Sequence, residues 1–202
     1  MAQAQRLVPL IGLTGGIGAG KSTALAALAH LGATVLSTDD VVHELYAGDP
    51  RLRAAVVGRW GPEVAPSGMV DRAAVARHAF AEDGERRWLE ELLWPLVGEC
   101  VGAWLTATRA RSPPSRAAVV EVPLLFEAGM EGLYDATIAV VAPEGLRRER
   151  AAGRGHELLQ ERTARQLSQG EKAARATYAV CNDGTEAQLR EKLSEILDKL
   201  KA

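Results

Sequence analysis

The sequence has little of several features that would point to particular classes of protein. It holds two cysteines in 202 residues, Cys100 and Cys181, and its four histidines are scattered, so we expect neither a disulfide framework nor a zinc site. It also lacks an excess of charge of one sign, because 24 basic and 26 acidic residues give a net charge of −2. Without an overall basic field to attract a polyanion, nucleic acid is not an expected partner.

Long apolar runs are missing as well. None approaches the ~20 residues needed to cross a bilayer. The start of the chain, MAQAQRLVPLIGLTGG, lacks the charged segment and the long apolar stretch of a secretion signal. We therefore predict a cytoplasmic protein with no membrane partner. Its length suits a single domain over residues 1–202 with sub-lobes.

Short apolar or β-branched runs alternate with helix-like sequence. The five runs are residues 7–13, 33–38, 116–122, 135–142 and 176–181. This alternation predicts an α/β fold, in which a five-stranded parallel sheet has helices on both faces. Near the C-terminus, Thr185 and Gln188 predict a capping box at the start of an amphipathic helix.

A helical insertion over residues 60–112 interrupts this alternation. Between residues 62 and 111 its apolar residues recur at helical spacing, and Pro95 predicts a kink or a helix junction among them. Three of the four tryptophans lie here, namely Trp88, Trp94 and Trp104. We expect Trp104 in the core, whereas Trp94 is open to stacking on an adenine-bearing acceptor.

The strongest signal lies at residues 15–22, GGIGAGKS, which match the phosphate-loop motif G-x-x-x-x-G-K-[ST]. Its glycines let backbone N–H groups point at phosphate oxygens. Lys21 would reach the β- and γ-phosphates, and the Ser22 hydroxyl would bind the magnesium ion that bridges them. Asp39, after the next strand, would also suit a dinucleotide fold, but Lys21 followed directly by Ser22 favours the mononucleotide loop.

An acidic pair, Asp39 and Asp40, directly follows the second predicted strand. The carboxyl ends of the strands form the ligand crevice of an open α/β sheet. A carboxylate there can orient an acceptor hydroxyl and take its proton during phosphoryl transfer. The alternative is helix N-capping, because Ser37, Thr38, Asp39 and Asp40 all favour a cap before the helical sequence VVHEL.

A second insertion, residues 143–170, is rich in arginine. Arg150 and Arg154 would share one face of a helix. A mobile lid that carries arginines can close over ATP and stabilise charge on the transferred group. The alternative for any single arginine is a solvated helix face balanced by nearby glutamates, but the cluster as a whole favours a lid.

Several stretches together resemble the dephospho-CoA kinase family. They are GLTGGIGAGKST, LSTDD, DRAAVARHAF, LLWPLV, VEVPLLFEAGM and CNDG, in this order. The resemblance covers nearly the whole chain and implies a P-loop kinase fold with a helical acceptor-binding insertion and a lid. It further implies that ATP phosphorylates the ribose 3′-hydroxyl of dephospho-CoA to give coenzyme A, with Mg²⁺ as cofactor.

The resemblance also implies roles for individual residues. The ATP-binding residues would be Gly16, Gly18, Ala19, Gly20, Lys21, Ser22, Thr23, Arg147 and Asn182, and Ser22 would hold the metal. Asp39 would be the catalytic base, and Lys21, Arg150 and Arg154 would be the other catalytic residues. The acceptor side would be lined by Asp39, Pro123, Leu124, Leu125 and Glu127. Ser37 and Trp94 stand where the family usually has aspartate and histidine.

Two other functions stay open at this point. A kinase of the same fold that acts on a nucleoside monophosphate would share the ATP site and the lid. A nucleotide-dependent switch would share only the phosphate loop, but the N-K-x-D and D-x-x-G motifs of GTPases are missing from the sequence. A kinase acting on dephospho-CoA as a monomer is the prediction that we favour.

Overall fold

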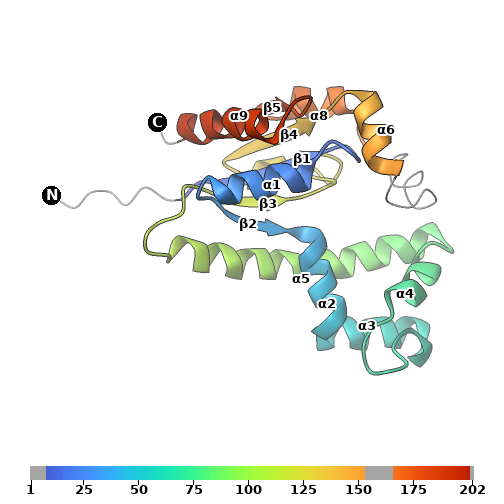
Figure 1. Ribbon diagram of the computed structural model, residues 1–202. Coiled ribbons are helices and arrows are strands. Elements are labelled where there is room, and N and C mark those ends of the chain that lie inside the picture. Colours follow the sequence, from blue (N-terminus) through green and yellow to red (C-terminus); the bar gives the residue numbers. More distant parts are fainter. Residues whose placement is uncertain (1–7, 153–165, 201–202) are drawn as a thin grey trace. The chain divides into compact units, whose positions relative to one another are not determined.

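The computed structural model describes residues 8–152 and 166–200 (Figure 1). The chain forms two compact units. The first comprises the described residues up to Leu36 and from Leu105 onward, and it contains the sheet. The second, Ser37–Trp104, is built of helices.

Within the described residues, five strands form one parallel sheet in the order β2-β3-β1-β4-β5. The strands are β1 (Leu10–Gly15), β2 (Thr34–Ser37), β3 (Ala118–Glu121), β4 (Ala136–Val141) and β5 (Tyr178–Cys181). Each lies within or overlaps one of the five predicted runs, so the predicted fold class is confirmed. β1 begins later than predicted and continues to Gly15, the first residue of the phosphate-loop motif.

The pairing places β1 in the centre of the sheet. Leu13 of β1 lies opposite Glu121 of β3 and Ile138 of β4, and both pairings are parallel. Strands covered on both faces are expected to be apolar throughout, and all four residues of β3 are buried. Because the pairings are parallel, the carboxyl ends of β1, β3 and β4 meet at one edge of the sheet.

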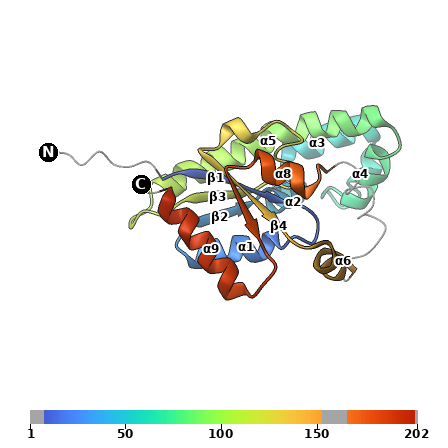
Figure 2. The ribbon, with the colours of Figure 1, turned by 90° about the horizontal axis from the view of Figure 1, so that it is seen from above.

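One face of the sheet is covered by α1 (Lys21–His30) and α9 (Glu186–Lys199) (Figure 2). Ile11 and Leu13 alternate onto this face and pack with Leu28 of α1 and Leu193 of α9, all of them fully buried. The predicted capping box at the start of α9 is confirmed, since the side chains of Thr185 and Gln188 bond reciprocally to each other's backbone N–H groups.

The opposite face is covered by the segment after β3 and by α8 (Gln169–Arg175). A Cβ atom on Gly12 would lie 2.5 Å from Leu125 Cδ1, so this glycine is needed for close packing. The Thr14 hydroxyl, on the same side as Gly12, donates to the carbonyl of Pro123 at 3.3 Å. A short 3-10 helix, η2 (Glu131–Leu133), follows this segment and leads to β4.

The predicted lid, residues 143–170, begins with α6 (Glu144–Ala152) and ends in the first turn of α8. Residues 153–165, which include Arg154, lie outside the described residues. The lid and its mobility therefore stay predictions.

The second unit contains α2 (Thr38–Gly48), α3 (Pro50–Trp60), the 3-10 helix η1 (Pro62–Val64), α4 (Arg72–Ala79) and most of α5 (Asp83–Arg109). Asp49 and Asp71 cap α3 and α4, because each carboxylate accepts two backbone N–H groups of the first turn. The predicted insertion over residues 60–112 overlaps this unit, which also includes α2 and α3.

Pro95 lies inside α5 and the helix continues through it, so the predicted junction is wrong, whereas the predicted kink stays a prediction. Apolar residues on both sides of the proline, such as Leu89 and Leu96, are buried. Their packing outweighs the one backbone hydrogen bond that proline removes. Trp94 is 50% exposed, and Trp104 is only partly buried rather than in the core.

Among the described residues, no helix combines the length and the apolar character that crossing a membrane requires.

Candidate active site

The phosphate loop joins the end of β1 to the start of α1. Gly18 and Gly20 have φ angles of 74° and 92°, which favour glycine. Within the described residues, no side chain caps α1 and no acidic residue lies in its first turn. The N-terminus of this helix therefore offers backbone N–H groups and a partial positive charge to an anion.

Lys21, the first residue of α1, folds back along the loop. Its ammonium group donates to the carbonyl oxygens of Gly15 at 3.1 Å and Gly16 at 3.3 Å. The cation is thereby held over the loop, where the motif predicts the phosphates. The contact of Lys21 with the phosphates stays a prediction.

Arg147 of α6 contacts the loop from the side. Its Nε donates to the Ile17 carbonyl at 2.9 Å, and Glu144 accepts from its guanidinium group at 2.8 Å. A Cβ atom on Gly18 would lie 2.4 Å from the Arg147 carbonyl oxygen, so this glycine is also required for the approach of α6. The structure thus brings the predicted ATP-binding residue Arg147 together with the loop.

Asn182, directly after β5, holds the other side of the loop. Its side-chain amide donates to the Ala19 carbonyl at 2.9 Å, and its side chain is buried. Its own carbonyl accepts from Arg150 at 3.3 Å. The amide group of Asn182 is therefore directed at the loop backbone, and its contact with ATP stays a prediction.

Two further predicted residues lie in the first turn of α1. Ser22 is exposed and Thr23 is partly buried. Glu121 ends the neighbouring strand β3 and is 8% exposed. A hydroxyl and a carboxylate at this edge of the sheet are hard oxygen ligands, which fit Mg²⁺.

The predicted acceptor residues follow β3. Leu124 is 40% exposed, whereas Leu125 is fully buried and packs over Gly12. Leu125 therefore packs beneath the segment Pro123–Glu127, which we call the acceptor wall because it holds the predicted acceptor residues after β3. The carboxylate of Glu127 accepts the backbone N–H of Leu167 at 2.8 Å.

Lys172 of α8 was not among the residues that the sequence predicted for the site. Its side chain is completely buried, and its ammonium group contacts the Pro123 carbonyl at 2.7 Å and the Glu127 carboxylate at 2.9 Å. Burial lowers the pKa of Lys172, and the neighbouring Glu127 opposes that shift. The only signal in the sequence was a lysine among the polar residues of a helix, which is typical of an exposed position.

In the second unit, Asp39 and Asp40 are the second and third residues of α2, and both are exposed. Of the four residues that favour a cap, Ser37 takes the N-cap position, without a side-chain capping hydrogen bond, so neither aspartate is the N-cap residue. Their charges still favour the first turn of the helix. Within the described residues, no hydrogen bond or ion pair engages the Asp39 carboxylate.

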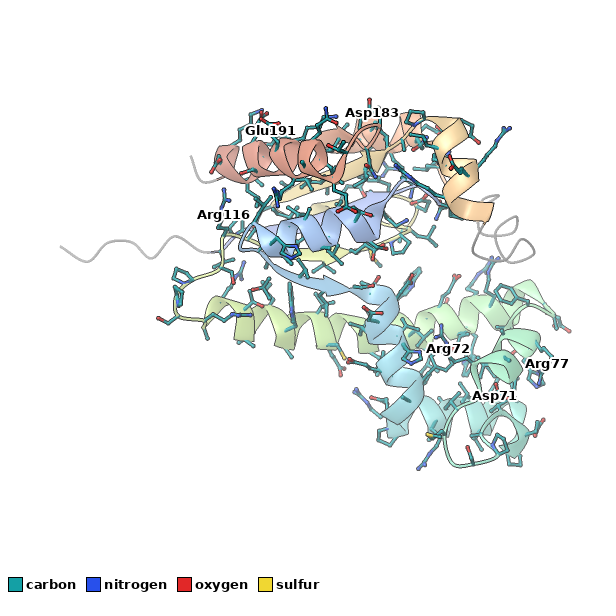
Figure 3. The ribbon with its side chains drawn as sticks, viewed as in Figure 1. Asp71, Arg72, Arg77, Arg116, Asp183 and Glu191 are labelled. Atoms are coloured by element: carbon teal, nitrogen blue, oxygen red, sulfur yellow. The ribbon has the colours of Figure 1, made fainter. Side chains whose placement is uncertain are left out.

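Arg72, the first residue of α4 (Figure 3), contacts α2 through its guanidinium group. Spacings of four and three residues place Asp39, His43 and Tyr46 along one helix face. The Arg72 guanidinium lies 2.9 Å from His43 Nδ1 and 5.7 Å from the centre of the Tyr46 ring. Burial raises the pKa of Tyr46 to about 12, against the opposing charge of Arg72, so the phenol stays neutral.

Comparison with known proteins identifies the fold's wider family. Residues 9–188 match the family model for dephospho-CoA kinase, which is most of the chain. The chain belongs to the dephospho-CoA kinase family. A dephospho-CoA kinase of Moorella thermoacetica is 43% identical over 172 residues, which cover 84% of this chain and 80% of the relative.

Solved structures agree with this family and fold. The Thermus thermophilus protein TT1252 is 31% identical, and it superposes with a TM-score of 0.80 over 96% of this chain and 99% of its own. A dephospho-CoA kinase from Campylobacter jejuni has a TM-score of 0.63 at 20% identity, with 95% of this chain and 96% of the other covered, and supports the fold alone. For a dephospho-CoA kinase, the phosphate loop described above is the expected donor site.

Proposed function

We propose that the protein transfers the γ-phosphoryl group of ATP to the ribose 3′-hydroxyl of dephospho-CoA and so produces ADP and coenzyme A. The observation that carries this proposal is the family match over residues 9–188, on a chain whose phosphate loop is complete. The bond from the acceptor oxygen to phosphorus forms as the bond to ADP breaks, and the hydroxyl proton passes to a base.

On the donor side, backbone N–H groups of the loop and of α1 bind the phosphates. Lys21 exchanges the Gly15 and Gly16 carbonyls for the β- and γ-phosphate oxygens. Arg147 contacts the loop and Arg150 contacts Asn182, which holds the loop, and these contacts support a proposed role for both arginines in stabilising charge on the bound phosphates.

Mg²⁺ is the proposed cofactor, with Ser22 as its protein ligand. Within the described residues, no group of three or more His, Cys, Asp or Glu side chains could hold a metal ion by itself. We therefore expect the ion to enter with the nucleotide, whose phosphates complete its coordination. When bound, it neutralises charge on the β- and γ-phosphate oxygens.

On the acceptor side, Asp39 is the proposed base. Its position supports this role, because it comes two residues after the end of β2 and the ligand crevice of such sheets lies at the carboxyl ends of the strands. Dephospho-CoA also carries a diphosphate, and the exposed guanidinium of Arg72 on the Asp39 face of α2 suits it. Pro123, Leu124 and Glu127 are the further residues proposed to line the acceptor site, and the buried Leu125 supports them.

The proposal extends to the setting of the reaction. Both substrates are small anions, and the balanced charge of the chain suits them better than nucleic acid. We propose that the enzyme acts in the cytoplasm as a monomer, without a nucleic-acid or membrane partner.

Paired variants of the acidic pair test the assigned base. Asp39→Asn keeps the shape of the side chain but cannot accept the proton, so kcat should fall by about 100- to 10,000-fold. Asp40→Asn is the matched control and should change kcat little. Release of ADP and formation of coenzyme A are measured with Mg-ATP and dephospho-CoA, after melting temperatures confirm that both variants fold.

If Asp40→Asn loses activity and Asp39→Asn retains it, the base is the neighbour. If the wild-type enzyme makes no coenzyme A under these conditions, the proposed function itself is wrong.

A further inference from the structure

Lys172 occupies an environment that is unusual for a lysine. Its side chain is 0% exposed, and its ammonium group has two described acceptors, the Pro123 carbonyl at 2.7 Å and Glu127 Oε1 at 2.9 Å. Lysines are almost never fully buried unless they are paired. Replacing such a buried ion pair with apolar residues often leaves stability unchanged or improves it, so stability alone is a weak reason for it.

The Pro123 carbonyl receives two hydrogen bonds from different elements. One comes from the Thr14 hydroxyl in β1, at 3.3 Å, and the other from Lys172 in α8. Thr14 directly precedes the phosphate loop, and Pro123 opens the turn that follows β3. This oxygen therefore links the residue before the phosphate loop to the start of the segment Pro123–Glu127, which holds the proposed acceptor residues.

Glu127, at the far end of the same turn, is also fixed by α8 and the residues before it. Its Oε1 accepts from both Lys172 and the Leu167 backbone N–H. Its Oε2 is buried, and no hydrogen-bond partner for it lies among the described residues. The carboxylate is thus held through one oxygen, and Lys172 bonds to both ends of the turn.

The helix that carries Lys172 is itself fixed to the donor side. Gln169 forms two hydrogen bonds with Ala142, the residue directly after β4; its side chain accepts the Ala142 N–H and donates to the Ala142 carbonyl, both at 2.9 Å. A Cβ atom on Gly16 would lie 3.4 Å from Gln169 Cγ, so this side chain packs directly against the phosphate loop. Ser168 and Glu171 form a capping box that fixes the first turn of α8.

We propose that Lys172 is a positioning residue for phosphoryl transfer, which holds the turn Pro123–Glu127 in register with the phosphate loop. This role rests on the proposed function, since it presumes that the turn lines the acceptor. Lys172 touches neither substrate. It acts through the Pro123 carbonyl and the Glu127 carboxylate, and without it the acceptor hydroxyl is no longer held in line with the γ-phosphate.

The competing explanation is that Lys172 only neutralises the charge of Glu127. Under that explanation, a neutral Glu127 would make the lysine dispensable. Under the positioning role, the Pro123 carbonyl still loses its ammonium donor when Lys172 is replaced. The two explanations therefore differ in a background that carries Glu127→Gln.

The first experiment compares Lys172→Met with Lys192→Met. Lys192 makes the same kinds of contact, to the Cys181 carbonyl at 2.8 Å and the Asp183 carboxylate at 3.2 Å, but it is exposed and lies on α9. Misplacing reacting groups by about 1 Å can cost about 100-fold, so we expect Lys172→Met to lower kcat by about 10- to 100-fold. The KM for dephospho-CoA should rise while the affinity for Mg-ATP changes little, and Lys192→Met should match the wild type.

The second experiment adds Lys172→Met to Glu127→Gln, which removes the unpaired buried carboxylate and should restore folding if the single variant is unstable. The double variant should still have a lower kcat than Glu127→Gln alone. Equal kcat in these two proteins would overturn the positioning role, as would unchanged kcat and KM in a folded Lys172→Met enzyme. Failure of the wild type to phosphorylate dephospho-CoA would instead refute the proposed function.

Discussion

At the scale of single residues, Asn182 shows how a buried side chain supports the phosphate loop. Its buried amide donates to the Ala19 carbonyl at 2.9 Å, and a Cβ atom on Gly20 would lie 2.0 Å from the same nitrogen. Its backbone N–H donates to Val141 at the end of β4. The loop conformation therefore depends on a side chain more than 160 residues away in the sequence.

We predict that Asn182→Asp weakens ATP binding. The carboxylate has the shape of the amide but cannot donate to Ala19, and a buried carbonyl left without its partner costs about 1–3 kcal/mol. The KM for ATP should rise, whereas the KM for dephospho-CoA should change little. Asp183→Asn, at the exposed neighbouring position, is the control. Equal KM values for ATP in the two variants would show that Asn182 does not support the loop.

At the scale of elements, the start of α4 contacts α2 through one side chain, that of Arg72. Asp71 caps α4, and this fixes the backbone of the next residue, Arg72, from which its side chain extends. Arg72 then reaches His43 on the Asp39 face of α2. The capped start of α4 thus explains how a flexible arginine comes to lie beside His43 and Tyr46 of another helix.

We predict that Arg72→Gln raises the KM for dephospho-CoA. Charge-assisted hydrogen bonds contribute about 1.5–3 kcal/mol, which corresponds to an increase of about 10- to 150-fold. The KM for ATP should stay the same. Arg77→Gln is the matched control, because Arg77 is an exposed arginine on the same helix (Figure 3). A similar KM in both variants would place the diphosphate elsewhere.

At the scale of the whole molecule, local patterns predicted the elements more successfully than the contacts between them. The strand runs, the phosphate loop and the Thr185 capping box depend on neighbours in sequence, and all three were predicted. The continuity of α5 through Pro95 depends on packing around the helix, and the prediction of a junction failed there.

Contacts between segments that are distant in the sequence could not be predicted from it. Lys172 looks like a surface residue until folding brings it to Pro123, 49 residues away. The unit boundaries at Ser37 and Trp104 follow from which helices pack together, whereas the proposed insertion was based on helical periodicity alone. The catalytic role of Asp39 stays a prediction, because it rests on strand order and on family resemblance.

The most direct test of the central claim is a comparison of acceptors. Wild-type enzyme with Mg-ATP is offered dephospho-CoA, AMP, CMP and adenosine in turn, kcat/KM is measured for each, and the position of the new phosphate is determined by phosphorus NMR. A site that recognises the whole acceptor can exceed 10,000-fold discrimination, and we expect at least about 100-fold preference for dephospho-CoA. The product should carry a 3′-phosphate. Efficient turnover of AMP or CMP, with none of dephospho-CoA, would contradict the account.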